Sequence, residues 1–539
     1  MSETWLAGWR FYLLLVALCL SLYLPGIAAI PVLDRDEARF AQATRQMLET
    51  GDFLHIRFQD EARNNKPAGI YWLQAAAVGA LSTARSTAIW PYRVPSLIGA
   101  SLAVLLSFGF GRALVGPRTA LIGAVLLATA LGTIAEAHIA KTDAALLAAI
   151  AGGQGALGLA YVRARGGTRI GRGIAAVFWL AEIAGIFLKG PIAPGLAVAT
   201  GAILSIADRD ARWLLGLRPV IGLAVMMLAV VPWLYAIEHA TEGQFLDQSL
   251  GHDFWSKVLG GQEAHGAPPL YYLALAFLTF WPGSLYLLPA VIGGWRRRTQ
   301  PASRFLMAWL VPAWIGLELV PTKLPHYALP LYPALALLAA STLVEGAGGA
   351  AWIAVANTIL WVLATLAIAA ALIVAPIQLG GGVMMSGVAG AGLLIALLAA
   401  LFYRRPGPIG AVTLLAAMAV VFAVSAAGWV VPDLDRLWLS RGAAALVARH
   451  PPPAGTTLAV IGYNEPSLVF LLNDAFKAQT ADVPVSEGSD ALVSSRDTAT
   501  FEQMLTARAL AARPIDSVRG TDYSNGQDMT LTLYQIVPR

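Results

Sequence analysis

The stretch 351–375, AWIAVANTILWVLATLAIAAALIVA, decides the fold class of this chain. It contains no charged residue and exceeds the roughly 20 apolar residues that a helix needs to cross a bilayer. Similar apolar runs recur on both sides of it along the chain. The sequence therefore predicts an all-α polytopic membrane protein.

The composition supports this prediction and excludes several other classes of protein. Of the 539 residues, 57% are hydrophobic and 13% are charged, against roughly 25% charged residues in ordinary soluble domains. This balance excludes a soluble enzyme and a disordered chain, and the long runs exclude an outer-membrane barrel. Cys19 is the only cysteine, so no internal disulfide and no cysteine-based zinc site can form. The net charge of +5 lies mostly in short loops, so we expect no nucleic-acid partner.

Apolar runs of spanning length predict about thirteen transmembrane helices. The predicted spans are 11–31, 90–111, 119–137, 144–162, 174–189, 191–207, 219–237, 270–294, 305–320, 328–344, 351–375, 385–402 and 409–431. For the first run, a cleaved signal peptide ending near Ala28 and Ala29 is the alternative.

Arginines in alternate loops predict the orientation of these spans. They are Arg10, Arg112, Arg118, Arg163, Arg165, Arg169, Arg172, Arg209, Arg212, Arg218, Arg296, Arg297, Arg298, Arg304, Arg404 and Arg405. By the positive-inside rule these loops face the cytoplasm. We therefore expect a multi-pass protein of the bacterial inner membrane, with a cytoplasmic N-terminus and a periplasmic C-terminal domain.

Two domains are predicted: a transmembrane catalytic domain over 1–431 and a small soluble α/β domain over 432–539. In the second, strand-like runs at Leu458–Ile461 and Met529–Val537 flank a helical pattern near 499–512. The turn-prone Ser524-Asn525-Gly526 precedes the last strand.

The periplasmic loop 32–89 is expected to carry two interfacial helices. Phe40, Ala43, Thr44, Met47 and Leu48 have the spacing of one apolar helix face, with Arg39, Gln42, Arg45, Gln46 and Glu49 on the other. This pattern predicts an amphipathic helix on the membrane surface that ends at Thr50-Gly51. Pro67 suits the first turn of a second helix over 67–82.

Acidic residues gather at the periplasmic helix ends. Asp34, Asp36 and Glu37 follow the first span, and Asp143 begins a later one. One interpretation is structural, because acids at a helix N-terminus complement its dipole or cap it. The other is a general base that takes a proton from an incoming hydroxyl.

Cationic residues occur at the same side: Lys66, Lys189, Lys323 and His326. Lysines are unexpected there under the positive-inside rule, although some snorkel at either interface. Together they predict a pocket for a phosphate. Because no Walker loop or dinucleotide fingerprint is present, the phosphate is expected to belong to a lipid carrier. A sugar leaving a polyprenyl phosphate needs cations for the phosphate and a carboxylate base for the acceptor, which predicts inverting displacement.

At these residues the chain resembles the GT-C lipid-linked glycosyltransferases, in particular the ArnT-like aminoarabinose transferases and the protein O-mannosyltransferases. The matching stretches are DEARFAQATRQMLETGDF, NKPAGIYWLQA, KTDAALL, FLKGPIA, HGAPPLYYL, KLPHYALPLYPALALL and YNEPSLVFLL. The resemblance implies thirteen spans, a periplasmic C-terminal domain, Asp36 and Asp143 as central carboxylates, and Lys66 with neighbouring cations at the donor phosphate. It also places His326-Tyr327 where the family has a tyrosine near the donor.

The residue before Lys66 departs from the family pattern. Aminoarabinose transferases carry a metal-binding glutamate there, and this chain has Asn65. An amide is a poor ligand for a divalent ion, so we expect no required cofactor. If the protein uses a metal, the candidate histidine ligands are His252, His265 and His326. Without a metal, His265 is either a contact to the acceptor or a solvated side chain of the loop.

The predicted function is transfer of a sugar from a polyprenyl-phosphate donor to lipid A or the core of lipopolysaccharide. A protein O-glycosyltransferase is the alternative within the class. A lipid-phosphate transporter or flippase is the alternative outside it, but transporters place ionisable groups near the middle of their spans, and here these groups gather at one face.

Overall fold

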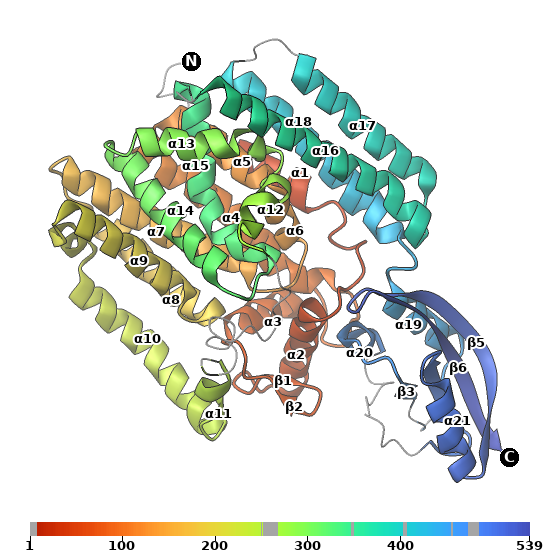
Figure 1. Ribbon diagram of the computed structural model, residues 1–539. Helices are drawn as coiled ribbons and strands as arrows, with labels where there is room; N and C mark the ends of the chain where they lie inside the picture. The colour runs from red at the N-terminus through yellow and green to blue at the C-terminus, as the bar shows by residue number, and fades with distance from the viewer. Residues whose placement is uncertain are drawn as a thin grey trace.

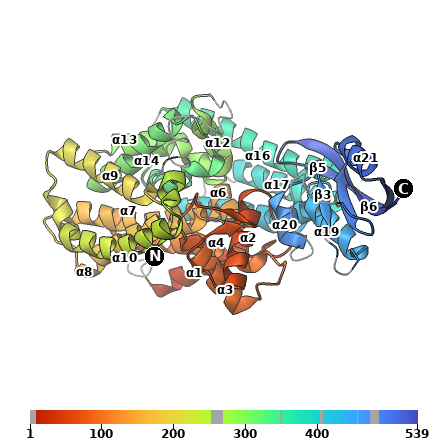
Figure 2. The same ribbon diagram turned by 90° about the horizontal axis from the view of Figure 1, so that it is seen from below.

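The structure, a computed structural model, describes residues 8–249, 251, 268–346, 350–402, 407–453, 456, 458–472 and 485–539. A large helical body fills most of the molecule, and a small domain built around a sheet lies at one end of it (Figure 1). The view from below shows this domain beside the helical body, with the C-terminus at its outer end (Figure 2).

The helical body consists of α-helices of very different lengths and a short β-hairpin in the loop after the first helix. The helices are α1 (Trp9–Tyr23), α2 (Asp36–Thr50), α3 (Gly69–Leu81), α4 (Trp90–Val115), α5 (Pro117–Thr129), α6 (Leu131–Ala137), α7 (Asp143–Arg165), α8 (Arg172–Lys189), α9 (Ile192–Asp208), α10 (Pro219–Ala240), α11 (Gln244–Leu246), α12 (Tyr271–Thr279), α13 (Leu287–Arg296), α14 (Pro301–Leu319), α15 (Tyr332–Glu345), α16 (Ala351–Leu379), α17 (Val383–Phe402) and α18 (Pro408–Ser425). The hairpin strands are β1 (Arg57–Phe58) and β2 (Glu61–Ala62), and the 3-10 helix η4 (Pro325–Leu331) precedes α15.

The prediction of a polytopic helical membrane protein is confirmed. Within the described ranges, seven helices are long and apolar enough to cross a membrane, or eight if the bent pair α5 and α6 forms one span. The number thirteen stays a prediction, because several predicted spans correspond to shorter helices.

Three predicted spans are interrupted or shortened in the structure. The run 11–31 forms a helix only to Tyr23, after which Pro25 and Gly26 turn the chain. The run 119–137 bends by 59° between α5 and α6, because the amide of Leu131 donates to the carbonyl of Trp281 at 2.9 Å and so leaves the helical ladder. The run 270–294 is divided by Pro282, which has no N–H to donate, into α12 and α13.

The C-terminal sheet has four strands in the order β3-β4-β6-β5. Its elements are α19 (Leu439–Arg449), β3 (Ala459–Ile461), α20 (Pro466–Leu472), β4 (Asp490–Ser494), α21 (Thr498–Ala507), β5 (Leu510–Asp522) and β6 (Gln527–Pro538). The strands β3 and β4 are parallel and the other pairs are antiparallel. The predicted strands at 458–461 and 529–537 and the turn at Ser524-Asn525-Gly526 are confirmed. The predicted helix 499–512 was too long, because the chain turns at Ala509, which has a positive φ, and enters β5. The domain boundary at 431/432 stays a prediction.

The helix α2 has the predicted end but not the predicted surroundings. Gly51 ends it in the left-handed conformation, as expected. Only part of the predicted polar face is open to water: Glu49 is exposed, whereas Arg45 is fully buried and donates to the carbonyls of Phe470 in α20 at 2.7 Å and Ser86 at 2.8 Å. Figures 1 and 2 both show α20 beside α2. The C-terminal domain therefore covers part of the face that the sequence predicted to be polar.

Candidate functional site

A cavity of about 600 Å³ opens among α7, α8, α10 and η4. Most of its lining is apolar, and its polar side chains include Asn65, Lys66, Asp143, Lys189, His326 and Tyr327. All six were named as site candidates from the sequence, with Asn65 as a secondary candidate that departs from the family pattern. Such a cavity suits a ligand with one charged group on a long apolar body.

Two glycines allow the helices that carry these residues to approach closely. A Cβ on Gly69 would lie 2.5 Å from the carbonyl oxygen of Phe187, so α3 can begin against the end of α8. This contact brings the segment before Gly69 next to Lys189. A Cβ on Gly99 would lie 2.6 Å from the Cα of Ala145, so α4 packs against the start of α7 beside Asp143.

Asp143 lies between two lysines. Its Oδ1 is 2.5 Å from Nζ of Lys189, and its Oδ2 is 3.6 Å from Nζ of Lys141. The ring Nε2 of His326 lies 3.9 Å from Oδ1. The side chain of Asp143 is 8% exposed. Buried charges of this kind require partners, and these contacts supply them.

Sequence reasoning missed two members of this cluster, Lys141 and Glu136. Nζ of Lys141 is 2.9 Å from Oε1 of Glu136 and 3.3 Å from Nδ1 of His326. Burial by itself lowers the pKa of Lys141, but the carboxylates of Glu136 and Asp143 outweigh it and raise the pKa above the usual value for lysine. The charges in the short segment 136–143, between two apolar runs, were the signal that could have revealed both residues.

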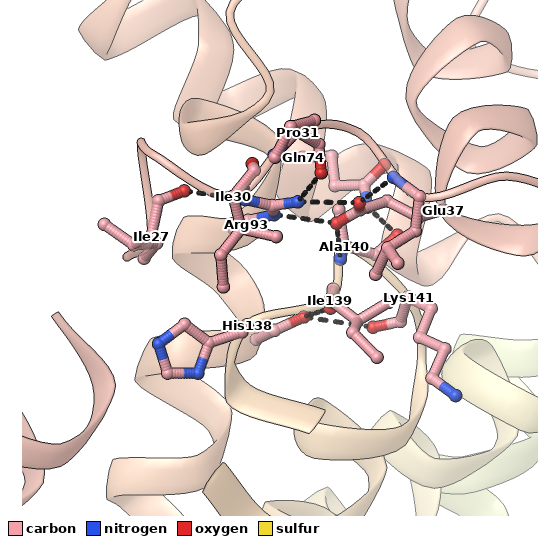
Figure 3. A network of polar contacts seen from close by, with 12 residues as sticks. Ile27, Ile30, Pro31, Glu37, Gln74, Arg93, His138, Ile139, Ala140 and Lys141 are labelled. Atoms are coloured by element: carbon pink, nitrogen blue, oxygen red, sulfur yellow. Dashed lines mark hydrogen bonds and ion pairs between the residues drawn. The ribbon is translucent and has the colours of Figure 1, made fainter. Parts of the chain in front are cut away.

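Glu37, which the sequence suggested as catalytic, is a fully occupied buried carboxylate (Figure 3). Oε1 accepts from Nε of Arg93 at 2.8 Å and from the amide of Ala140 at 2.7 Å. Oε2 accepts from Nη2 of Arg93 and the amide of Leu33, each at 2.8 Å. These four bonds use the lone-pair sites of the carboxylate, so Glu37 has none left for a substrate proton. Its contacts are those of a positioning residue.

Asp36 has a different environment from its neighbour Glu37. Its side chain is 58% exposed, and its Oδ1 lies 4.0 Å from Nη2 of Arg63. Asp36 does not line the cavity, but its charge acts on both Lys141 and His326 at the polar end. It is therefore an accessible carboxylate close to the cluster.

Two further candidates are not among the side chains that line the cavity. Nζ of Lys323 donates to the carbonyls of Glu318 at 2.6 Å and Val320 at 3.3 Å, so it caps the end of α14. Asp34 accepts a bond at 3.2 Å from the amide of Ser467 at the start of α20, and burial raises the pKa of Asp34 to about 6. The structure thus gives Lys323 and Asp34 structural partners rather than a place at the cavity.

The histidines His252 and His265, with the rest of 252–267, lie outside the described residues. Among the residues that are described, no group of three His, Cys, Asp or Glu side chains could hold a metal ion. At the position of the family's metal-binding glutamate, Asn65 lines the cavity with an amide. These residues do not fit a divalent ion, so no chemical step is derived through one.

The chain was compared with protein families, with curated proteins and with solved structures. No family model matches the chain. It is 29% identical over 341 residues, 62% of its length, to an undecaprenyl phosphate-alpha-4-amino-4-deoxy-L-arabinose arabinosyl transferase of Pseudomonas fluorescens. It is 30% identical over 319 residues to the enzyme of that name from Pseudomonas aeruginosa. These matches span 60% and 55% of the relatives' own lengths.

Two crystal structures of ArnT from Cupriavidus metallidurans have the same fold. The structure bound to undecaprenyl phosphate matches with a TM-score of 0.75, 19% identity and coverage of 98% of both chains. The apo structure matches with a TM-score of 0.71, 19% identity and coverage of 97% of both chains. The expected resemblance is thus confirmed: the chain has the fold of the crystallised ArnT and resembles the aminoarabinose transferases in sequence.

Proposed function

We propose that this protein is a glycosyltransferase that moves a sugar from a polyprenyl-phosphate donor to lipid A or the core of lipopolysaccharide. The observation that carries the proposal is the cavity, which is apolar over most of its lining and holds Lys66 and Lys189 at its polar end. The apolar part suits a polyprenyl chain, and the ammonium groups suit its phosphate. The names of the relatives support a donor carried on undecaprenyl phosphate.

In the proposed reaction, Asp36 takes the proton of the acceptor hydroxyl as the oxygen attacks the anomeric carbon. The bond from that carbon to the phosphate oxygen breaks, and the electron pair leaves with the polyprenyl phosphate. Lys66 and Lys189 stabilise the charge that grows on this leaving group. Attack from the face opposite the phosphate inverts the anomeric centre.

Asp143 has a separate role in this proposal. It holds the ammonium of Lys189 at 2.5 Å, so the lysine is already oriented at the cavity before a phosphate arrives. Preorganised charge of this kind costs no reorganisation during the reaction. Asp143 therefore positions a cation, whereas Asp36 is the base.

The proposal also concerns the location of the protein in the cell. The comparisons and the apolar helices support a membrane protein. We infer that the membrane is the bacterial inner membrane, with the cavity, the acids around Asp36 and the C-terminal domain on the periplasmic side, because the arginine-rich loops belong on the cytoplasmic side.

Mass spectrometry of a deletion strain tests the function. We expect one sugar to be lost from lipid A or core oligosaccharide and the same sugar to accumulate on undecaprenyl phosphate. Complementation with the wild-type gene should reverse both changes. Loss of sugar from proteins with unchanged lipopolysaccharide would indicate a protein O-glycosyltransferase. Unchanged glycans with the carrier lipid held on one side of the membrane would indicate a flippase.

A further inference from the structure

Lys141 is a buried lysine with an unusual set of neighbours. Its Nζ lies 2.9 Å from Oε1 of Glu136, 3.3 Å from Nδ1 of His326 and 3.6 Å from Oδ2 of Asp143. The side chain is 9% exposed, so the ammonium does not snorkel to water. Lys141 does not line the cavity, but two of its three neighbours, His326 and Asp143, do. Its effect on the cavity therefore passes through them.

The backbone that carries Lys141 is held in place by buried polar groups (Figure 3). Glu37 accepts from the amide of Ala140 at 2.7 Å, and Gln74 donates to the carbonyl of Ala140 at 3.1 Å. Ser96 donates to the carbonyl of Ile139 at 2.7 Å. Contacts from α2, α3 and α4 thus fix the residues directly before Lys141. Glu37 lies next to the proposed base, but its hydrogen bond to Ala140 gives it a different role, which is to hold the segment that leads to Lys141.

The contact between Lys141 and His326 defines the proton positions on the imidazole ring. An ammonium has only donors, so Nδ1 of His326 must accept, and the ring hydrogen must then be on Nε2. The carboxylates of Glu136 and Asp143 keep Lys141 charged. The largely buried position of the ring by itself disfavours the imidazolium form, and a proton on Nδ1 would in addition face this ammonium at 3.3 Å.

We propose that Lys141, held by Glu136, is a positioning residue that keeps His326 as a neutral imidazole with its hydrogen on Nε2. The ring then offers the donor phosphate one directed hydrogen bond and neither a positive charge nor a basic lone pair. This inference rests on the proposed function, because it assigns the phosphate as the partner of Nε2. The other charged groups around the ring are Asp143, whose Oδ1 is 3.9 Å from Nε2, and Lys189 and Asp36.

A neutral N–H group on His326 affects how the product leaves the cavity. With Lys66 and Lys189 at the cavity, a third positive charge would bind the released polyprenyl phosphate more tightly and slow its departure. A neutral N–H stabilises the leaving phosphate without that charge, and it does so at every pH at which Lys141 is protonated. Donor binding should therefore not follow a histidine titration.

The first experiment measures the tautomer directly. Ring nitrogens of protein labelled with 15N-histidine are recorded by NMR in detergent micelles, and comparison with His326→Gln identifies the His326 signals. In the wild type we expect a hydrogen on Nε2 and a lone pair on Nδ1, unchanged between pH 6 and 8. In Lys141→Met, which removes the donor to Nδ1, the hydrogen should no longer be confined to Nε2, and signals of both neutral forms of the ring should appear. A hydrogen on Nδ1, or an imidazolium at pH 7, in the wild type would overturn the inference without any variant.

The second experiment measures the affinity for geranylgeranyl methyl phosphate, a phosphodiester whose charge is constant over this pH range. We expect His326→Gln, which keeps an N–H donor, to bind within about threefold of the wild type, and His326→Leu to bind about tenfold more weakly. Lys141→Met, in which the hydrogen is no longer confined to Nε2, should bind more weakly than the wild type, by up to about tenfold. Lys323→Met is the matched control, because it removes another buried lysine that caps α14, and its affinity should stay within about twofold of the wild type.

The two experiments separate the inference from the proposed function. Failure of the wild type to bind the phosphodiester would overturn the donor-phosphate function, whatever the tautomer. Normal wild-type binding together with equal affinities of the Gln and Leu variants, or with wild-type affinity in Lys141→Met, would overturn the role of His326 and Lys141 alone. Melting temperatures of all variants identify any that fail to fold, and the wild-type NMR result stands without them.

Discussion

Adjacent acids in this chain have opposite environments. Glu37 is buried with four hydrogen bonds, whereas the neighbouring Asp36 is 58% exposed with Arg63 at 4.0 Å. A general base needs an accessible lone pair, and of these two carboxylates only Asp36 is exposed. The assignment of the base therefore depends on which side of α2 each residue occupies.

Replacement of Asp36 by Asn keeps its size and removes the charge that a base needs. We expect turnover to fall by at least about a hundredfold, with melting temperature and membrane insertion unchanged. Glu61→Gln, which alters an exposed carboxylate in the hairpin of the same loop, is the matched control and should retain activity. Turnover of Asp36→Asn near that of the wild type would exclude the role.

Replacement of Lys66 by Met keeps the apolar stem and removes the ammonium. If Lys66 holds the leaving phosphate, both donor affinity and turnover should fall, each by about tenfold or more. Lys66→Arg keeps the charge and should retain part of the activity. Wild-type rates and affinity in Lys66→Met, measured with a radiolabelled donor, would show that this lysine only snorkels.

Removal of metal tests the consequence of Asn65. An amide at the cavity is a weak ligand for a divalent ion, and the two lysines can stabilise the phosphate themselves. We expect protein treated with a chelator and then desalted to retain most of its transfer activity. A loss that added zinc or another divalent ion specifically restores would contradict this and direct attention to His252, His265 and His326.

At the scale of elements, the helix α2, which begins with the proposed base, contacts the C-terminal domain. Arg45 donates to a carbonyl of α20, and its guanidinium lies 4.1 Å from the ring centre of Phe470. Asp34, two residues before Asp36, receives the amide of Ser467 from the same helix. The C-terminal domain therefore braces the segment that carries Asp36.

This contact should depend on pH through Asp34. Burial raises its pKa to about 6, so the folded protein binds this proton more tightly than the unfolded chain does. The stabilisation from this proton is fully present below about pH 4 and is lost as the pH rises through about 6. We expect the melting temperature of the wild type to fall between pH 4.5 and 7 by more than that of Asp34→Asn, measured in the same detergent. Parallel curves for the two proteins would contradict this.

At the scale of the whole molecule, the arginine loops predict which side of the membrane each part occupies. Reporter fusions after Arg172 and Arg298 should report cytoplasm, and fusions after Glu263 and at the C-terminus should report periplasm. The paired sites act as controls for one another, because each reporter is active on one side only. A cytoplasmic C-terminus would remove the basis for placing the cavity and Asp36 outside.

The sequence by itself determined the properties that depend on neighbours along the chain. Runs such as 351–375 must leave water whatever surrounds them, so they predict the membrane class, and the end of α2 at Gly51 follows from local turn chemistry. It also named the six polar cavity residues discussed here. Lysines and acids at periplasmic helix ends are conspicuous in an apolar chain, and the family resemblance pointed to Asn65 and Tyr327.

Only the tertiary structure decided which of these charges meet. Asp143 and Lys189 are 46 residues apart, Glu37 and Arg93 are 56 apart, and Lys141 and His326 are 185 apart. Such pairs depend on close helix contacts, as at Gly69 and Gly99, and on the bend between α5 and α6, none of which has a local signal. The sequence placed Glu37 and Lys323 with the chemistry, and only the fold shows the buried partners that each of these side chains has. Lys141 was overlooked because its importance lies in a histidine that is distant in the sequence.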